Sequence, residues 1–307
     1  MDTNVVTIGE VRRSSRERAS GPRSLLRATL GKLARVGEPW TSRFTHSIER
    51  RFTRVPAPPA VTARAVCAVD LATGAQMLAK NAWLITPPAS LTKLATAILF
   101  TRASEGRWHE QVEVRAQDLC RGSTMGLAAG DVITRQDVLY GLILPSGNEA
   151  ALVAARLIGP HWLDGINALA AELGMTRTRF LTPHGRDARL QFSTARDLAR
   201  LAAAAFAVPH IRLAAASSHY EARLGGPNER TLTVTSTVRM LGEPHVVAGK
   251  TGSTPGARGC LALLVEKAGS EAIVILMGAT VAFDACGKVV DVSDRRYDDA
   301  RGVIRSL

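Results

Sequence analysis

Short runs of apolar residues stand at both ends of the folded part of the chain. Each run is bounded by turn-forming or polar residues, as strands buried in a sheet are. The runs occupy residues 66–69, 76–79, 232–235, 246–247, 260–265 and 272–277. A turn around Thr73-Gly74 separates the first two, and the polar segment 266–270 between the last two predicts a hairpin loop.

The middle of the chain has helical spacing instead. Leu94, Ile98 and Leu99 follow a Pro-Pro-Ala-Ser segment, so a helix begins at about Ser90. Further helices are expected over residues 137–144, 149–158, 194–201 and 296–304, the third opened by a capping box of Thr194 and Asp197. Strands at both ends with helices between them predict an α+β fold: an antiparallel sheet flanked by helices, with an inserted helical region.

The first part of the chain differs from the rest. Residues 1–60 are interpreted as a basic, largely disordered arm that ends in the linker Pro56-Ala57-Pro58-Pro59, and residues 61–307 as one folded domain. Leucines 25, 26, 30 and 33 lie near helical spacing among basic residues, which is compatible with weak contact with an anionic membrane surface. A solvated arm is the alternative that this short stripe leaves open.

Charge sharpens this division. The 307 residues are 46% hydrophobic, enough for a sizeable core, and carry 39 Lys and Arg against 27 Asp and Glu, a net charge of +12. Residues 1–64 hold 13 of the basic and 5 of the acidic residues, so their net charge is +8 and the remainder carries only +4. With 5% aromatic residues and no basic cluster, that remainder argues against a nucleic-acid partner.

Several classes of protein lack support in the sequence. Four cysteines (Cys67, Cys120, Cys260 and Cys286) are too few for a disulfide scaffold and are expected to pack in the interior. No His and Cys spacing is typical of a metal centre, so neither metal nor cofactor is expected. No apolar run reaches the length of a transmembrane helix, and the arginines from Arg12 onward leave no apolar core for a signal peptide.

Three short motifs carry candidate chemistry. They are Ser90-Leu91-Thr92-Lys93, Ser146-Gly147-Asn148 and Lys250-Thr251-Gly252, and each pattern occurs once. Alone, the first could be a helix cap, the second a turn and the third a strand end. Together, in this order and in suitable local structure, they are a strong signal for a serine acyl-transfer enzyme.

The spacing of the first motif explains its chemistry. Residues i and i+3 of a helix share one face, so the Lys93 amine can reach the Ser90 hydroxyl. The helix start also directs unpaired N–H groups toward the anion formed on attack. To accept a proton, Lys93 needs a pKa lowered from about 10.4 to roughly 7–8, by burial and a second cation for which Lys250 is the candidate.

The other two motifs suggest supporting roles. Ser146 could relay a proton to the leaving amine, and Asn148 could orient Lys93 or hold a substrate amide. Gly249 and Gly252 flank Lys250-Thr251 on an expected edge strand, where missing side chains would let an extended substrate pair with the backbone. His184 is interpreted as a loop residue, because Lys93 already supplies the base.

With these residues in view, the chain from about residue 62 to 304 resembles the low-molecular-weight penicillin-binding proteins, the serine-type D-alanyl-D-alanine carboxypeptidase and endopeptidase family (peptidase family S11). The resemblance implies a fold like that of the β-lactamases and transpeptidases. The residues that carry it, besides the three motifs, lie in the segments 70–74, 88–93, 141–151, 173–180 and 193–198.

The resemblance also implies a reaction. Ser90 would attack the bond between two D-alanines of a peptidoglycan stem peptide, or a β-lactam, and form an acyl-enzyme. The N–H groups of Ser90 and Ser253 would form the oxyanion hole. The substrate-binding residues implied are Thr251, Gly252, Ser253 and Arg296, with Arg295 as the competitor for the arginine near the substrate carboxylate. Such a substrate places the protein in the periplasm or cell envelope.

Three alternatives stay open. The short layout, with Asp284-Ala285-Cys286-Gly287-Lys288 near the end, is similar to the endopeptidase branch, which cuts D-alanyl cross-links. A class A-like β-lactamase shares two motifs, but no Glu-x-x-Leu-Asn segment supplies its deacylating carboxylate. A non-catalytic wall-binding relative is the third. Arg186 after Gly185 also departs from the apolar residue usual in the family, which could alter the rim of the cleft.

Overall fold

The computed structural model describes residues 55–285, 289–290 and 293–307. Almost all of the basic arm, including its leucine stripe, therefore lies outside the described residues, and so does Cys286. The described part starts just before the Pro-rich linker, and Ala79 donates a backbone hydrogen bond to Pro56 there.

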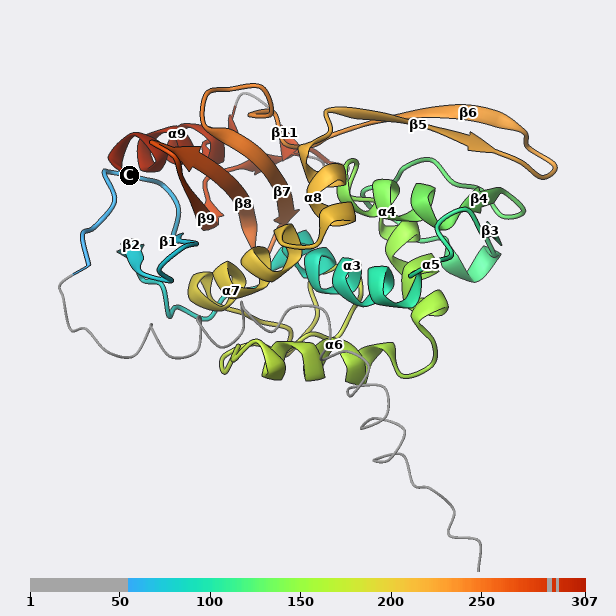
Figure 1. Cartoon of the computed structure of the whole chain (residues 1–307), viewed down its shortest axis with the longest axis horizontal. Helices are drawn as coiled ribbons and strands as arrows, with labels where there is room; N and C mark the ends of the chain where they lie inside the picture. The colour runs from blue at the N-terminus through green and yellow to red at the C-terminus, as the bar shows by residue number, and fades with distance from the viewer. Residues whose placement is uncertain (1–54, 286–288, 291–292) are drawn as a thin grey trace, which may run out of the picture. The chain divides into compact units, whose positions relative to one another are not determined.

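A five-stranded antiparallel sheet joins the two ends of this region (Figure 1). Its strands, in spatial order, are β2 (Gln76–Lys80), β1 (Ala65–Asp70), β9 (Ser270–Ala279), β8 (Arg258–Lys267) and β7 (Val246–Thr254). Ala65 pairs with Met277 and Asp70 with Ala272, so N- and C-terminal pieces complete one sheet, as the sequence predicts. β7 lies at one edge.

Both faces of the sheet are covered. In β8, Leu261, Leu263 and Val265 join the apolar cluster beneath α9 (Arg296–Ser306), while Cys260, Ala262 and Leu264 join the larger cluster on the helical side. A strand that is buried on both faces has a continuous run of apolar residues, and that run identified β8 in the sequence.

The helical region lies against the other face and extends beyond it. Its helices are α3 (Thr92–Ala103), α4 (Arg135–Ile143), α5 (Asn148–Ile158), α6 (Trp162–Glu172), α7 (Ala195–Phe206) and α8 (Pro209–Ala216). The minor elements are η1 (Ala89–Leu91), η2 (Ala116–Asp118), β3 (Gln111–Glu113), β4 (Val132–Thr134), β10 (Ala282–Phe283) and β11 (Val289–Val290). Within the described ranges, no single helix is long and apolar enough to cross a bilayer, and only the bent pair α7 and α8 meets that test jointly.

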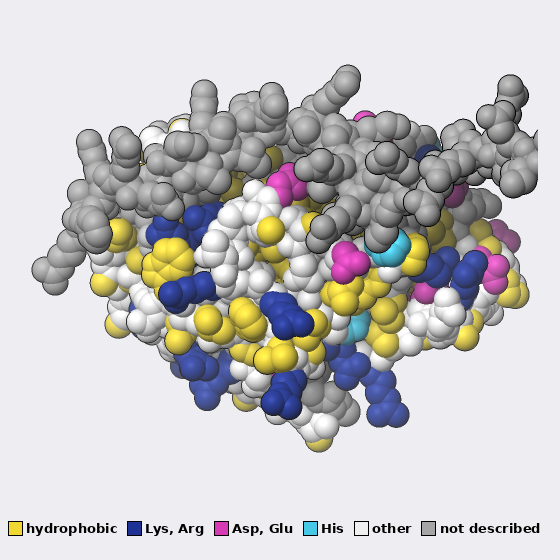
Figure 2. Space-filling model, turned by 90° about the horizontal axis from the view of Figure 1, so that it is seen from below, with side chains coloured by type: hydrophobic (Ala, Val, Ile, Leu, Met, Phe, Trp, Pro, Cys, Tyr) yellow, Lys and Arg dark blue, Asp and Glu magenta, His cyan; other side chains and the backbone are white. Residues whose placement is uncertain are grey.

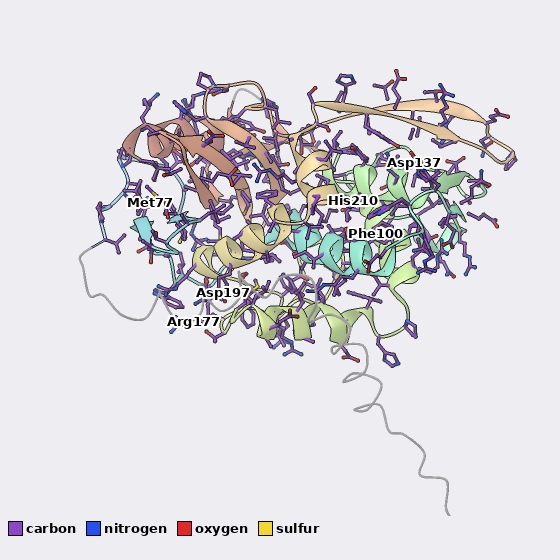
Figure 3. All side chains as sticks on the ribbon, in the orientation of Figure 1. Met77, Phe100, Asp137, Arg177, Asp197 and His210 are labelled. Carbon is purple, nitrogen blue, oxygen red and sulfur yellow. The ribbon has the colours of Figure 1, made fainter. Side chains whose placement is uncertain are left out.

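One predicted strand has a different neighbour. Residues 232–235 belong to β6 (Arg230–Thr235), which pairs with β5 (His219–Leu224) in a separate hairpin over the helical region (Figure 1). Tyr220 of this hairpin stacks on Tyr140 and donates a hydrogen bond to Asp137, whose position is labelled in Figure 3. Contacts with α4, together with an antiparallel backbone bridge between Gly225 and Val132 of β4, therefore hold the hairpin.

The helix boundaries also refine the sequence analysis. One 3₁₀ turn, η1, contains Ser90, and the α-helix begins at Thr92. Thr194 caps α7 by accepting from the N–H of Asp197, but the Asp197 carboxylate accepts from Arg177 and Thr178 instead of returning a bond to the cap. The predicted capping box is thus only half formed, and α7 runs on to Phe206.

Candidate active site

Ser90 and Lys93 lie as the helical spacing predicts. The Lys93 Nζ atom is 2.9 Å from Ser90 Oγ, within hydrogen-bond distance. Ser90 retains a small exposed fraction of 9%, whereas Lys93 is fully buried. Ala89, directly before Ser90, has a φ of 49°, a left-handed conformation that non-glycine residues rarely adopt. Ser90 therefore follows a strained turn and lies within hydrogen-bond distance of the buried Lys93 amine.

Two further acceptors fix the Lys93 amine. Its Nζ atom lies 2.9 Å from Oδ1 of Asn148 and 2.8 Å from the backbone carbonyl oxygen of His184. The Asn148 amide is itself oriented, because its Nδ2 donates to the carbonyl of Arg121 at 3.1 Å. Of the two roles considered for Asn148, the geometry thus favours orienting Lys93. His184 contributes its backbone, while its Nδ1 accepts from the N–H of Arg186.

Both lysines of the motifs have lowered pKa values. Burial lowers the pKa of Lys93 to about 7, although the nearby Glu149 carboxylate raises it. Burial, together with repulsion from Lys93 and Arg296, lowers the pKa of Lys250 well below its usual range. Among the described residues neither lysine forms an ion pair with a carboxylate. Lys93 can therefore be neutral near physiological pH, as a proton acceptor must be.

Ser146 occupies the link between α4 and α5. Its φ is 63°, and its buried Oγ has no hydrogen-bond partner within the described part of the chain. An unpaired buried hydroxyl costs about 1–3 kcal/mol. The backbone around this hydroxyl is anchored, because the Gly147 N–H donates to the Gly141 carbonyl and the Asn148 N–H donates to the Ser123 carbonyl.

The third motif lies on the edge strand β7, as the sequence predicts, and Lys250 is fully buried there. The sequence analysis explained Gly249 and Gly252 by substrate access, but the structure shows that close packing leaves no room for a side chain at either position. A Cβ on Gly252 would lie 2.9 Å from the Ser90 nitrogen, and one on Gly249 would lie 2.7 Å from a methyl carbon of Leu263. Gly252 therefore lets β7 approach η1 closely enough to place the third motif beside the nucleophile.

Arg296 requires a correction. The resemblance assigns it to the substrate carboxylate, but its side chain is buried and engaged behind β7. It forms a bidentate ion pair with Asp294 and donates to the carbonyl oxygens of Gly252 at 3.0 Å and Cys260 at 3.2 Å. With its guanidinium turned to these partners, Arg296 supports the strand that carries Gly252. Arg295 is exposed and pairs with Asp298.

The sequence analysis did not identify two carboxylates that lie near the cleft. Glu149 is buried next to Asn148 and accepts from Thr124 Oγ1 at 2.5 Å and from the Met125 N–H at 2.6 Å. Asp187 accepts from Thr254 Oγ1 at 2.6 Å and from the Gly256 N–H at 2.9 Å. Glu149 thus holds the wall beside Asn148, and Asp187 ties the loop after His184 to the end of β7. Adjacency to motif residues was the only available signal.

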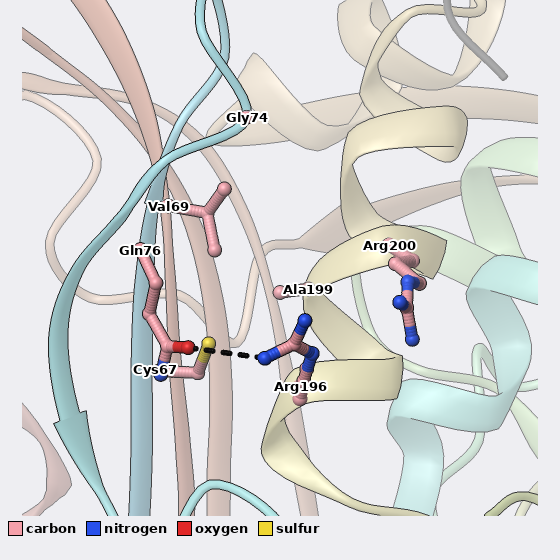
Figure 4. A pocket seen from close by; sticks show the side chains of 7 residues that line it. All are labelled: Cys67, Val69, Gly74, Gln76, Arg196, Ala199 and Arg200. Atoms are coloured by element: carbon pink, nitrogen blue, oxygen red, sulfur yellow. Dashed lines mark hydrogen bonds between the residues drawn. The ribbon is translucent and has the colours of Figure 1, made fainter. Parts of the chain in front are cut away.

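The remaining candidate groups lie elsewhere. A small pocket between β1, β2 and α7 contains Cys67 and Arg196 but none of the site residues (Figure 4). Cys67 and Cys260 are buried and unpaired, as expected of packing residues, and burial raises their pKa values to about 12 and about 11. Cys120 is partly buried. Within the described ranges no group of three or more His, Cys, Asp or Glu side chains could hold a metal ion.

Several curated proteins are similar to this chain in sequence. D-alanyl-D-alanine carboxypeptidase DacC of Escherichia coli is 31% identical over 236 residues, which are 72% of this chain and 58% of that protein. DacF of Bacillus subtilis is 27% identical over 76% of this chain and 61% of that protein. The chain thus spans about three fifths of the length of these curated relatives.

Solved structures agree with the fold. A D-alanyl-D-alanine carboxypeptidase from Mycobacterium tuberculosis has a TM-score of 0.72 and 25% identity, covering 83% of this chain and 94% of that one. The Streptomyces K15 DD-transpeptidase has a TM-score of 0.73 and 24% identity, covering 81% and 98%. The model of the D-alanyl-D-alanine carboxypeptidase family, peptidase S11, matches residues 52–281, and the chain belongs to that family.

Proposed function

We propose that the protein is a serine-type D-alanyl-D-alanine carboxypeptidase that acts on peptidoglycan stem peptides through an acyl-enzyme on Ser90. The observation that carries this proposal is the buried Lys93 amine, 2.9 Å from Ser90 Oγ, with a pKa lowered to about 7 by burial. Relatives that match most of the described region are named D-alanyl-D-alanine carboxypeptidases, which supports the proposal and a location in the cell envelope.

Acylation begins with neutral Lys93. It takes the proton of Ser90, and Oγ attacks the carbonyl carbon of the penultimate D-alanine. The N–H of Ser90 lies in the first turn of a 3₁₀ helix, where amides have no partner within the helix, and with the N–H of Ser253 it stabilises the oxyanion. Each such donor contributes about 2.7–4 kcal/mol to transition-state stabilisation.

The tetrahedral intermediate then collapses. The peptide C–N bond breaks, the terminal D-alanine leaves as an amine that takes a proton, and an ester to Ser90 remains. The unpartnered Ser146 hydroxyl relays that proton from Lys93. Deacylation reverses the roles: Lys93 removes a proton from water, hydroxide attacks the ester, and Ser90 recovers its proton.

Lys250 and Thr251 hold the substrate carboxylate. Lys250 donates its one observed hydrogen bond to the Thr251 carbonyl, and its charge is opposed by Lys93 and Arg296. A bound carboxylate offsets that repulsion and favours the charged form of Lys250. β-Lactams present a carboxylate beside a reactive carbonyl, so they are expected to acylate the same serine.

Mass spectrometry after incubation with a penicillin tests the serine. We expect one adduct on Ser90, no adduct on Ser90→Ala, and an unchanged adduct on Ser217→Ala, whose hydroxyl bonds the Leu213 carbonyl far from the motifs in sequence. Folded protein that leaves penicillin intact and carries no adduct would refute the proposal. Rapid turnover of many equivalents of penicillin would instead indicate a β-lactamase.

A second assay separates the two peptidase activities. Release of D-alanine from a pentapeptide stem is measured beside cleavage of a cross-linked stem dimer. Faster turnover of the pentapeptide supports the carboxypeptidase. Preference for the dimer would reassign the protein as an endopeptidase that uses the same residues.

A further inference from the structure

An exposed tryptophan lies between two arginines on the surface next to β2. Trp83 is 43% exposed and Ile85, two residues on, is 52% exposed. The guanidinium carbon of Arg196 is 4.4 Å from the centroid of the Trp83 ring, and that of Arg177 is 5.4 Å from it. We call Trp83, Ile85, Arg177, Arg179 and Arg196 the Trp83 surface.

Backbone pairing brings these residues together from three segments. Thr86 pairs with Ser193, and Arg179 pairs with Phe192, so the segments that follow Trp83 and Arg177 flank one central segment. The N–H of Arg196 donates to Ala82 at 3.0 Å. Figure 4 shows the Arg196 side chain directed toward Gln76 from α7, and Figure 3 marks Arg177 near the same helix. The surface is therefore built on ordered backbone.

Two arginines of this surface, Arg177 and Arg179, are not paired with a carboxylate among the described residues. Many arginines of the described region pair with carboxylates, such as Arg156 with Asp118 and Arg212 with Glu271. Figure 2, seen from below, shows Lys and Arg side chains interspersed with hydrophobic ones and a few Asp and Glu over the part of the molecule that is not grey.

The basic N-terminal segment enters the fold nearby. Pro56 accepts a hydrogen bond from Ala79 of β2 at 3.0 Å, and Trp83 follows the end of β2 by three residues. Residues 1–64 carry a net charge of +8. The chain that carries this charge thus continues from Pro56, beside the same strand β2 that precedes Trp83.

We propose that the Trp83 surface docks on an anionic lipid bilayer, beside the point where the basic segment leaves the fold. Guanidinium groups attract anionic headgroups, and an indole ring favours the region between headgroups and acyl chains. A soluble polyanion would engage the arginines but leave Trp83 and Ile85 in water. The basic segment and a second copy of the chain are both positively charged, so neither complements this surface.

Sedimentation of the full chain with vesicles tests the docking. The vesicles contain either phosphatidylcholine alone or phosphatidylcholine mixed with phosphatidylglycerol. We expect binding only to the anionic vesicles, and we expect Arg177→Gln/Arg179→Gln to weaken it by on the order of tenfold. The control Arg223→Gln/Arg305→Gln removes the same charge from two exposed arginines elsewhere and is expected to keep most of the binding.

The contribution of Trp83 is tested separately. Trp83→Ser is expected to weaken vesicle binding several-fold, whereas Leu213→Ser, which changes another exposed apolar residue, leaves it unchanged. Thermal melting of each variant confirms that it folds. Equal losses in the target and control variants would show attraction by net charge alone and overturn the proposal. So would binding to soluble polyphosphate or to an oligonucleotide that depends on Arg177 and Arg179 while vesicle binding does not.

Discussion

Buried basic side chains lie on both sides of strand β7, but only those on one side are paired with a carboxylate. On the cleft side, Lys93 and Lys250 are fully buried and have no carboxylate ion pair among the described residues. Behind the strand, Arg296 is also buried but forms a bidentate pair with Asp294, in which Nε and Nη2 each donate at 2.7 Å. The strand therefore separates unpaired amines from a fully paired guanidinium.

The difference follows from what each group must do. Burial lowers the pKa values of both lysines, which makes a neutral amine accessible for proton transfer. Burial alone would also lower the pKa of Arg296, but its hydrogen bonds with Asp294 outweigh that effect and raise it. A buried amine without a carboxylate partner thus becomes a reactive group. A buried guanidinium with such a partner keeps its charge and positions the backbone.

The largest effect is expected when the reactive side loses its base. Lys93→Met should lower the rate of Ser90 acylation by about 10²–10⁴-fold, because Lys93 is the one basic side chain that bonds Ser90 Oγ among the described residues. Its stability should not fall, since a buried amine is replaced by an apolar chain of similar length. Stopped-flow acylation by a fluorescent penicillin and urea unfolding measure the two quantities.

The matched control for that variant is Lys267→Met, which changes a lysine that bonds the carbonyls of Ile304 and Arg305 at the end of α9. It should acylate normally. A Lys93→Met protein that acylates at the wild-type rate would remove Lys93 from the mechanism.

On the side of β7 where the basic group is paired, the expected effect of a substitution is a loss of stability. Arg296→Met leaves the Asp294 carboxylate buried without its partner, so the free energy of unfolding should fall by about 3–5 kcal/mol. The double variant Arg296→Met/Asp294→Leu should recover part of that loss. Denaturant titration measures both, and Arg295→Met, which breaks only an exposed pair with Asp298, is the control. An equal loss in the control would contradict the comparison.

The pH dependence of acylation sharpens the comparison further. Only neutral Lys93 accepts a proton, so the rate should fall about tenfold for each pH unit below its pKa and level off above it. Burial places that pKa at about 7. Glu149→Gln removes the carboxylate that raises this pKa, so the falling limb should move to lower pH. A rate that stays constant through the acidic range would show that Lys93 is not the base.

The smallest effect is expected at the far end of β7. Asp187→Asn keeps an oxygen for Thr254 or Gly256 but removes the charge from both hydrogen bonds. Hydrogen bonds to charged groups are worth about 1 kcal/mol more than neutral ones, so D-alanine release should slow by on the order of fivefold. Asp284→Asn serves as the control, because it removes a carboxylate from a different loop. No change in Asp187→Asn would mean that this tie does not shape the cleft.

Local patterns in the sequence predicted most of the fold. The apolar runs of β8 and β9 are buried on both faces, and Lys93 follows Ser90 by one helical turn, so each signal lies within a few neighbouring residues. Residues 232–235 were predicted as a strand, but their partner β5 was not identified, because a strand pattern does not specify its neighbour.

The contacts that complete the site depend on residues distant in sequence. The His184 carbonyl reaches Lys93 across 91 positions, and the Arg296 guanidinium reaches Gly252 across 44. Every residue has a backbone carbonyl, so the sequence does not show which carbonyl contacts Lys93. An arginine near a motif also looks the same in the sequence whether its side chain faces substrate or supports a strand. For this reason the motif residues were found, while the placement of Arg296 was not.

The pairing of β1 with β9 has a consequence for folding. Ala65 and Met277 are neighbours in the sheet although most of the chain separates them. Closing so long a loop is slow, and β1 and β2 alone form only a two-stranded ribbon, which is marginally stable in water. Ser90 and Lys93 are made early by the ribosome, but the candidate site can form only after β7, β8 and β9 have followed.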